Sequence, residues 1–119
     1  MENKHKFELL DLRYMQEISR GDISYERRLA NVFIETIPED LLTLKRHFDE
    51  KSIEEIKKIS HHMQSSLFIM GLEQKLSAYM EFEAYENADG KEIKEKIAFI
   101  TKICMRAVEE AKVYLKGLA

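Results

Sequence analysis

The clearest pattern of apolar and polar positions in the chain lies between residues 52 and 71. Apolar residues recur there at steps of three or four, which places them on one stripe of a helix. The stripe consists of Ile53, Ile56, Ile59, Met63, Leu67 and Met70. Ser52 followed three residues later by Glu55 is a capping box, and Gly71 is a typical residue just after a helix. The pattern therefore predicts a helix that begins at Ser52 and ends at Gly71.

The segments before this helix predict two further helical regions. Residues 1–20 contain spaced apolar residues, and we expect part of them to form a short helix across one end of the fold. A polar break follows, with Asp22 or Ser24 as the next helix cap. Over residues 23–48 the apolar stripe continues through Pro38, so this segment is either two helices or one kinked helix. The unbroken stripe favours one kinked helix.

Two helices are predicted after residue 71. The first is a shorter amphipathic helix that should end near Tyr85, with the apolar positions Leu72, Leu76, Tyr79 and Met80. Residues 87–90 read as a turn, and Asp89 followed three residues later by Glu92 is a second capping box. The last helix has the most regular stripe in the chain, at Ile93, Ile97, Ile100, Cys104, Ala107, Ala111 and Leu115. Its alternating steps of three and four suit the shallow antiparallel packing of a bundle.

These elements predict an all-α fold. We expect an antiparallel four-helix bundle with up-down-up-down topology and a short additional N-terminal helix. The chain of 119 residues reads as a single domain, with residues 1–20 as an N-terminal capping segment and residues 22–118 as the helical bundle. One proline and four glycines leave little room for a turn-rich β fold.

Composition and charge narrow the functional class. The net charge of −3 and the lack of a basic stripe argue against a nucleic-acid partner. No apolar run is long enough for a membrane span, and the first residues lack the apolar segment of a signal peptide. Cys104 is the single cysteine and lies on an apolar stripe, so we expect a small core residue. We expect a cytoplasmic monomer that contacts neither membrane nor nucleic acid, and the chain ends favour a free-standing protein.

His61 lies on the opposite side of its predicted helix from the apolar stripe. At about 100° per residue, it is roughly 160° from the middle of the stripe, whereas His62 lies at about 100°, on the flank. The residues on the same side as His61 are Lys57, Lys58, Gln64, Ser65 and Phe68. The exposed face therefore presents an imidazole, two amines, an amide, a small hydroxyl group and an aromatic ring.

The residues around His61 resemble the signature of histidine phosphotransfer domains of two-component phosphorelays. The resemblance is carried by His61-His62-Met63-Gln64-Ser65-Ser66, Met70-Gly71-Leu72 and Leu76. In that family the histidine is followed by any residue, an apolar residue, usually a lysine and two small residues, with a glycine ten positions after the histidine. The resemblance implies that His61 is the phosphoacceptor and that the fold is an antiparallel four-helix bundle. Gln64 stands where the family usually has lysine, and Lys57 is the candidate to supply the missing charge.

The resemblance also implies a partner and a role for each residue. The partner would be a receiver domain of a response regulator, or of a hybrid sensor histidine kinase, that supplies the aspartate and Mg²⁺. This chain would be a relay component rather than an enzyme, with no cofactor of its own. Besides His61, we expect Lys57 and Gln64 to stabilise the phosphoryl group. The residues expected to dock the partner are Lys58, Ser65, Phe68 and Gly71.

Three other classes of function stay open on the sequence. A helical adaptor without phosphotransfer would have the same bundle, with His61 as an ordinary surface residue. A metal site is disfavoured because His61 and His62 diverge by about 100° on a helix and neither is part of a Glu-x-x-His motif. An acid–base enzyme has little support, because Glu54 and Glu55 are explained as residues of the first helical turn.

Overall fold

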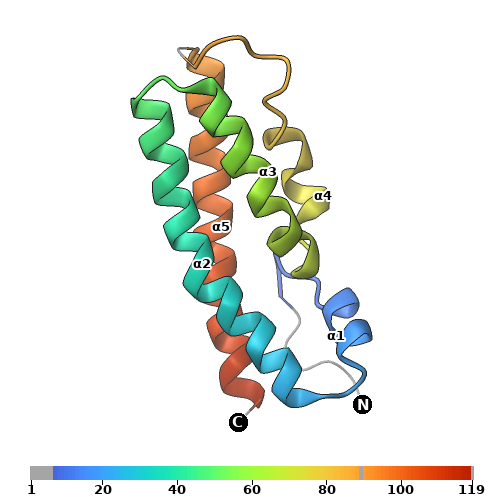
Figure 1. Cartoon of the computed structure of the whole chain (residues 1–119). Helices are drawn as coiled ribbons and strands as arrows, with labels where there is room; N and C mark the ends of the chain where they lie inside the picture. The colour runs from blue at the N-terminus through green and yellow to red at the C-terminus, as the bar shows by residue number, and fades with distance from the viewer. Residues whose placement is uncertain (1–6, 89, 119) are drawn as a thin grey trace.

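The computed structural model describes residues 7–88 and 90–118 of the chain, and all regular secondary structure in these ranges is helical. The all-α prediction is confirmed. In chain order the elements are α1 (Arg13–Ser19), α2 (Ile23–Asp49), α3 (Ile53–Ile69), α4 (Glu73–Leu76), the 3-10 turn η1 (Ser77–Tyr79) and α5 (Lys91–Leu118) (Figure 1).

Three long helices make up most of the fold. α2 packs against both α3 and α5 and runs antiparallel to each of them (Figure 1). α4 lies against α3, and η1 lies against α5, where the rings of Tyr79 and Phe99 stack with centroids 4.0 Å apart. The result is an elongated body measuring 49 × 21 × 20 Å.

α2 is one helix that continues through Pro38, so the interpretation of a single helix is confirmed. Its N-cap is Asp22, whose Oδ1 accepts a hydrogen bond from the Tyr25 N–H at 3.2 Å. A proline lacks the N–H that would bond to the carbonyl four residues earlier, which costs the helix one hydrogen bond. The buried stripe on both sides of Pro38 offsets that loss and consists of Ala30, Phe33, Ile37, Leu41 and Leu44.

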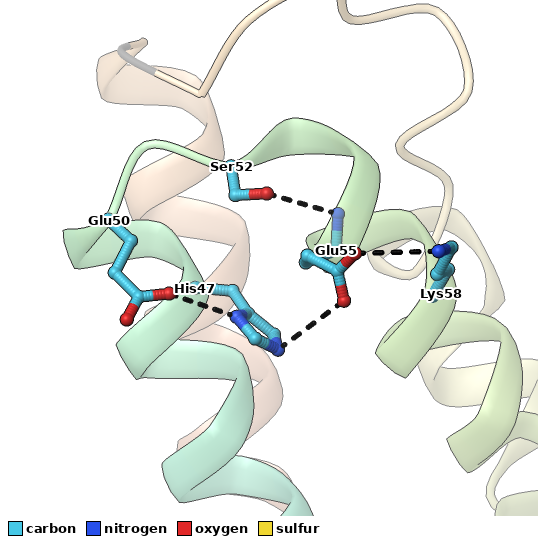
Figure 2. Close-up of polar contacts among 5 residues, drawn as sticks. All are labelled: His47, Glu50, Ser52, Glu55 and Lys58. Carbon is cyan, nitrogen blue, oxygen red and sulfur yellow. Dashed lines mark hydrogen bonds and ion pairs between the residues drawn. The ribbon is translucent and has the colours of Figure 1, made fainter.

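The turn between α2 and α3 forms half of the predicted capping box (Figure 2). Ser52 is the N-cap of α3, and its hydroxyl accepts a hydrogen bond from the Glu55 N–H at 3.4 Å. The Glu55 carboxylate does not return to Ser52; it lies 3.4 Å from Lys58 Nζ and 4.0 Å from His47 Nε2. The Ser52 N–H donates instead to the His47 carbonyl at 3.0 Å, and His47 Nδ1 lies 3.3 Å from Glu50. The predicted start of α3 is therefore correct, with a different partner for the Ser52 N–H.

The predicted helix ending near Tyr85 is wrong in length. Helical structure stops at η1, and the chain then returns toward the start of α5 in an irregular segment (Figure 1). Tertiary contacts hold the chain in this non-helical path: Ser60 Oγ on α3 donates to the Met80 carbonyl at 2.8 Å. The irregular segment buries Phe82 and Ala88 against the core.

α5 buries the predicted apolar stripe. Leu115 is partly buried, and the buried positions of the stripe are Ile93, Ile97, Ile100, Cys104, Ala107 and Ala111. Cys104 is confirmed as a core residue, and burial raises the pKa of its thiol to about 12. The expected capping box of Asp89 and Glu92 involves a residue outside the described ranges. The pattern of steps of three and four therefore located this helix correctly.

The residues before α1 seal one end of the core. Leu9, Leu10 and Leu12 are buried, and the Glu110 carboxylate of α5 accepts the N–H groups of Leu9 and Leu10 at 3.1 and 3.0 Å. The Asp11 N–H donates to the Met70 carbonyl at the end of α3, at 3.2 Å. The predicted short N-terminal helix is confirmed as α1, which packs against α2.

Candidate functional site

The candidate site is the exposed face of α3. This helix buries Ile53, Ile56, Ser60, Met63 and Leu67. Ile59, which belonged to the predicted stripe, is only partly buried, and Ser60 takes its place in the core. The core-facing side is thus rotated slightly toward α4, and His61 is exposed at the middle of the helix, about 120° around the axis from the centre of the buried residues.

The two adjacent histidines have different surroundings. His62 lies on the side of α3 that faces α2, with its Nε2 3.8 Å from Asp40 Oδ2. The Asp40 side chain is 16% exposed, and burial raises the pKa of its carboxyl group. His61 has no hydrogen-bond or ion-pair partner among residues 7–88 and 90–118. His61 is therefore the imidazole whose ring nitrogens are free to meet another molecule.

Lys57 lies one turn before His61, on the side toward α4. Its Nζ is 3.8 Å from Glu54 Oε2, and its side chain is only 18% exposed. Side chains on a helix lean toward the N-terminus, so the ammonium group points along α3 away from His61. For Lys57 to reach a group on His61, the ion pair with Glu54 must open.

Gln64 lies one turn after His61, also on the side toward α4. It is exposed, and the same lean toward the N-terminus carries its amide toward His61. Gln64 lines a hollow of about 240 Å³ between α3 and α4, and two carboxylates, of Glu73 and Glu81, line it too. An amide can donate to a phosphoryl oxygen without adding charge. This side of His61 is therefore polar, with acidic groups at its far edge.

Lys58 and Ser65 flank His61 on the side toward α2. Lys58 is 75% exposed at its side chain, and its Nζ lies 3.4 Å from the Glu55 carboxylate (Figure 2). Ser65 is exposed and small, so little of this chain stands between His61 and an approaching surface. The structure therefore places Lys58, Gln64 and Ser65 around His61 on one exposed face, with the mostly buried Lys57 at its edge.

Phe68 extends this face toward α1. Its side chain is 43% exposed, and its ring packs against the Tyr14 ring with centroids 4.8 Å apart and an angle of 58° between the rings. Tyr14 is 41% exposed, so both rings have area left for contact. The sequence pattern did not indicate this contact, because Tyr14 and Phe68 belong to separate helices.

Gly71 lies after the end of α3 and packs against the N-terminal segment instead of projecting from the exposed face. Its φ of +77° is in the left-handed region, which favours glycine. A Cβ there would overlap the Asp11 carbonyl oxygen and lie 2.6 Å from Asp11 Cβ. Gly71 also lines a hollow of about 320 Å³ next to Phe68. Its immediate role is close packing against the N-terminal segment, and its expected contact with a partner stays a prediction.

The rim of that hollow carries a local ion pair. Arg13 Nη2 lies 2.6 Å from Asp11 Oδ2. Hydrogen bonds from the Arg13 side chain and backbone lower the pKa of the Asp11 carboxyl group to about 2. Asp11 is therefore ionised at any physiological pH, and its charge is largely matched by Arg13.

Among residues 7–88 and 90–118, no group of three or more His, Cys, Asp and Glu side chains is arranged to hold a metal ion. No helix in the same ranges has the length and apolar character that crossing a membrane requires. Comparisons with models of known families, with curated proteins and with solved structures found no match for this chain.

Proposed function

We propose that this protein is a phosphorelay intermediate that carries a phosphoryl group on His61. The observation that carries the proposal is the placement of His61: exposed, at mid-helix, and without a polar partner among the described residues. The sequence pattern around His61 resembles that of histidine phosphotransfer domains. The antiparallel packing of α2 with α3 and α5 is compatible with the bundle of that family, with α4 and η1 in place of a long helix.

The proposed reaction is a reversible transfer between His61 and an aspartyl phosphate. The unprotonated ring nitrogen of His61 attacks the phosphorus, a P–N bond forms, and the P–O bond to the aspartate breaks. The aspartate leaves as a carboxylate, so the reaction needs no external oxidant or reductant. Transfer in the other direction reverses each of these steps. The partner, a receiver domain of a response regulator or hybrid sensor kinase, supplies the aspartate and the Mg²⁺ that offsets phosphoryl charge.

The contribution of this chain is positioning. α3 is a regular helix of 17 residues, anchored at its start by Ser52 and at its end by the Asp11–Met70 hydrogen bond. A rigid helix presents His61 in a fixed orientation, which reduces the entropy lost on reaching the reactive geometry. Ser65 leaves room for the partner, and the Phe68–Tyr14 pair provides an apolar contact area beside it.

Stabilisation of the phosphoryl group is proposed to come from Lys57 and Gln64. A phosphoryl group carries more negative charge than the single carboxylate of Glu54, so it can attract Lys57 away from its present ion pair at 3.8 Å. Gln64 adds an amide donor from the turn that follows His61. Lys58, which is more exposed, is assigned to partner docking.

A transfer assay tests the proposed function. Receiver domains are charged with a small phosphodonor and Mg²⁺, freed of the donor, and mixed with this protein. We expect a label on this protein that is lost in acid and persists in base, as a phosphohistidine does. A folded protein that acquires no label from any receiver in a broad panel would contradict the proposal and favour a helical adaptor.

A further inference from the structure

A second exposed surface lies between α2 and α5, away from His61. A groove of about 790 Å³ runs there, and none of its lining residues belongs to α3. The apolar residues that line it are Pro38, Leu41, Leu42, Phe48, Ile97, Ala98 and Met105. Leu42 is 70% exposed, more than any other large apolar side chain in the described ranges, and Met105 is 41% exposed. Apolar side chains gathered along a groove mark a surface that gains free energy when it is covered.

The groove continues toward the start of α5. A second hollow of about 470 Å³ shares Phe48, Asp49 and Lys94 with the first and reaches Lys51 in the α2–α3 turn and Lys91 at the start of α5. The two hollows together extend from Met105 on one side of the groove to the residues around the α2–α3 turn. We refer to the two together as the α2–α5 groove.

The charges lining the α2–α5 groove are mostly of one sign. Five lysines line it: Lys45, Lys51, Lys91, Lys94 and Lys102. The single acidic residue that lines it, Asp49, lies 3.4 Å from Lys45 Nζ and so matches only that lysine. The other four lysines have no ion-pair partner within the described part of the chain. The protein as a whole has a net charge of −3, so this basic rim is a local feature.

We propose that the α2–α5 groove binds an acidic amphipathic helix of a partner protein. On α2 the lining residues run from Pro38 to Asp49, which at about 1.5 Å per residue is roughly 17 Å, or about three helical turns. A helix of that length can place an apolar stripe against Leu42 and Met105. Acidic residues on its flanks then face Lys94 and Lys102, which gives the complementary charge that fixes orientation and partner choice.

Charge and shape argue against two other occupants of the groove, a second copy of this chain and an anionic membrane. In a symmetric dimer formed through this surface, each copy would bring four unpaired lysines and no unpaired lining carboxylate into one interface, and such an excess of like charge is unfavourable. An anionic membrane would satisfy the lysines but would not need a concave apolar groove between two helices. The partner helix is a different molecule from the receiver domain proposed to meet His61, so this inference stands apart from the proposed function.

Two synthetic helical peptides of about four turns test the inference. One has leucines at positions i, i+3, i+4 and i+7 with glutamates elsewhere, and the other keeps the leucines but replaces every glutamate with lysine. Amide shifts and fluorescence anisotropy measure binding to the full-length protein. We expect the acidic peptide to bind at least about tenfold more tightly at low salt, with shifts around Leu42 and Met105, and the difference to shrink as salt rises.

Variants with matched controls complete the test. Leu42→Glu and the double change Lys94→Glu with Lys102→Glu should each weaken the acidic peptide by about tenfold or more. Val113→Glu is the control, because Val113 is an exposed apolar residue of α5 outside the groove, and it should leave binding unchanged. The proposal is overturned by equal binding of both peptides or by no binding of either. It is overturned equally by a dimer that Leu42→Glu dissociates, or by binding to anionic vesicles alone.

Discussion

Neighbouring residues on and after α3 differ in whether they contact the rest of the chain. Gly71 turns the chain in the left-handed region directly beneath the Asp11 carbonyl. Ser60, on the core side, donates to the Met80 carbonyl of the following segment. His61, the next residue, has no such partner among the described residues. Adjacent positions on one helix thus separate into a structural side and a side available for chemistry.

Gly71→Ala should lower the free energy of unfolding by about 2 kcal/mol or more. About 1 kcal/mol comes from placing a side chain in the left-handed region, and the rest from the overlap with Asp11. Gly21→Ala is the matched control, since Gly21 has φ +83° but open space around the position of a Cβ. It should cost only about 1 kcal/mol. Urea unfolding of both variants measures the difference, and equal losses would refute the packing role of Gly71.

Lys57→Ala should slow phosphotransfer by about tenfold, which corresponds to about 1.4 kcal/mol of lost stabilisation in the transition state. It should also shorten the lifetime of the phosphohistidine. Lys58→Ala is the comparison. Because Lys58 is assigned to docking, this change should lower the apparent affinity for the receiver more than it lowers the transfer rate at saturating receiver. If the phosphotransfer rate and the phosphohistidine lifetime are both unchanged in Lys57→Ala, Lys57 does not belong to the site.

At the scale of elements, long amphipathic stripes were enough to locate α2, α3 and α5. Each stripe carries a strong local pattern, and the caps Asp22 and Ser52 mark two of the starts. The helix after Gly71 could not be predicted in length, because the segment that follows it is held by tertiary contacts, among them the bond from Ser60 of another helix to the Met80 carbonyl. The contact between Phe68 and Tyr14 was missed for the same reason: it joins two elements far apart in the sequence.

Ser60→Ala should destabilise the fold by about 1–2 kcal/mol, because it leaves the buried Met80 carbonyl without its hydrogen bond. Thr36→Ala is the control, since the Thr36 hydroxyl bonds only to a carbonyl four residues earlier in its own helix. That change should alter stability by less than about 0.5 kcal/mol. Chemical denaturation reports both values, and hydrogen exchange should show faster opening around Phe82 in Ser60→Ala. Protection equal to that of the unmodified protein would count against the role of Ser60.

At the scale of the whole molecule, two surfaces with different characters lie on different helices. The face of α3 has His61 with polar and aromatic neighbours, whereas the α2–α5 groove is apolar with a rim of lysines. The sequence pattern predicted the first surface, because an unusual residue opposite an apolar stripe is visible in one helix. The groove depends on how α2 and α5 pack together, so no single stretch of sequence indicated it.

Ser65→Arg tests whether the α3 face must stay open to a large partner. Ser65 is exposed, so the fold should be retained, as circular dichroism can check. We expect transfer to slow by about tenfold or more, since the arginine side chain occupies the approach to His61. Ser24→Arg places the same side chain at an exposed position near the start of α2 and should leave transfer unchanged. Undiminished transfer in folded Ser65→Arg would contradict the proposed approach.

The most direct measurement of the central claim compares His61→Gln with His62→Gln in the receiver transfer assay. The two histidines are adjacent and both exposed, yet only His62 lies near a carboxylate, that of Asp40. We predict that His62→Gln accepts the phosphoryl group and that His61→Gln does not. Labelling of His61→Gln, or loss of labelling in His62→Gln alone, would contradict the assignment of His61 as the phosphoacceptor.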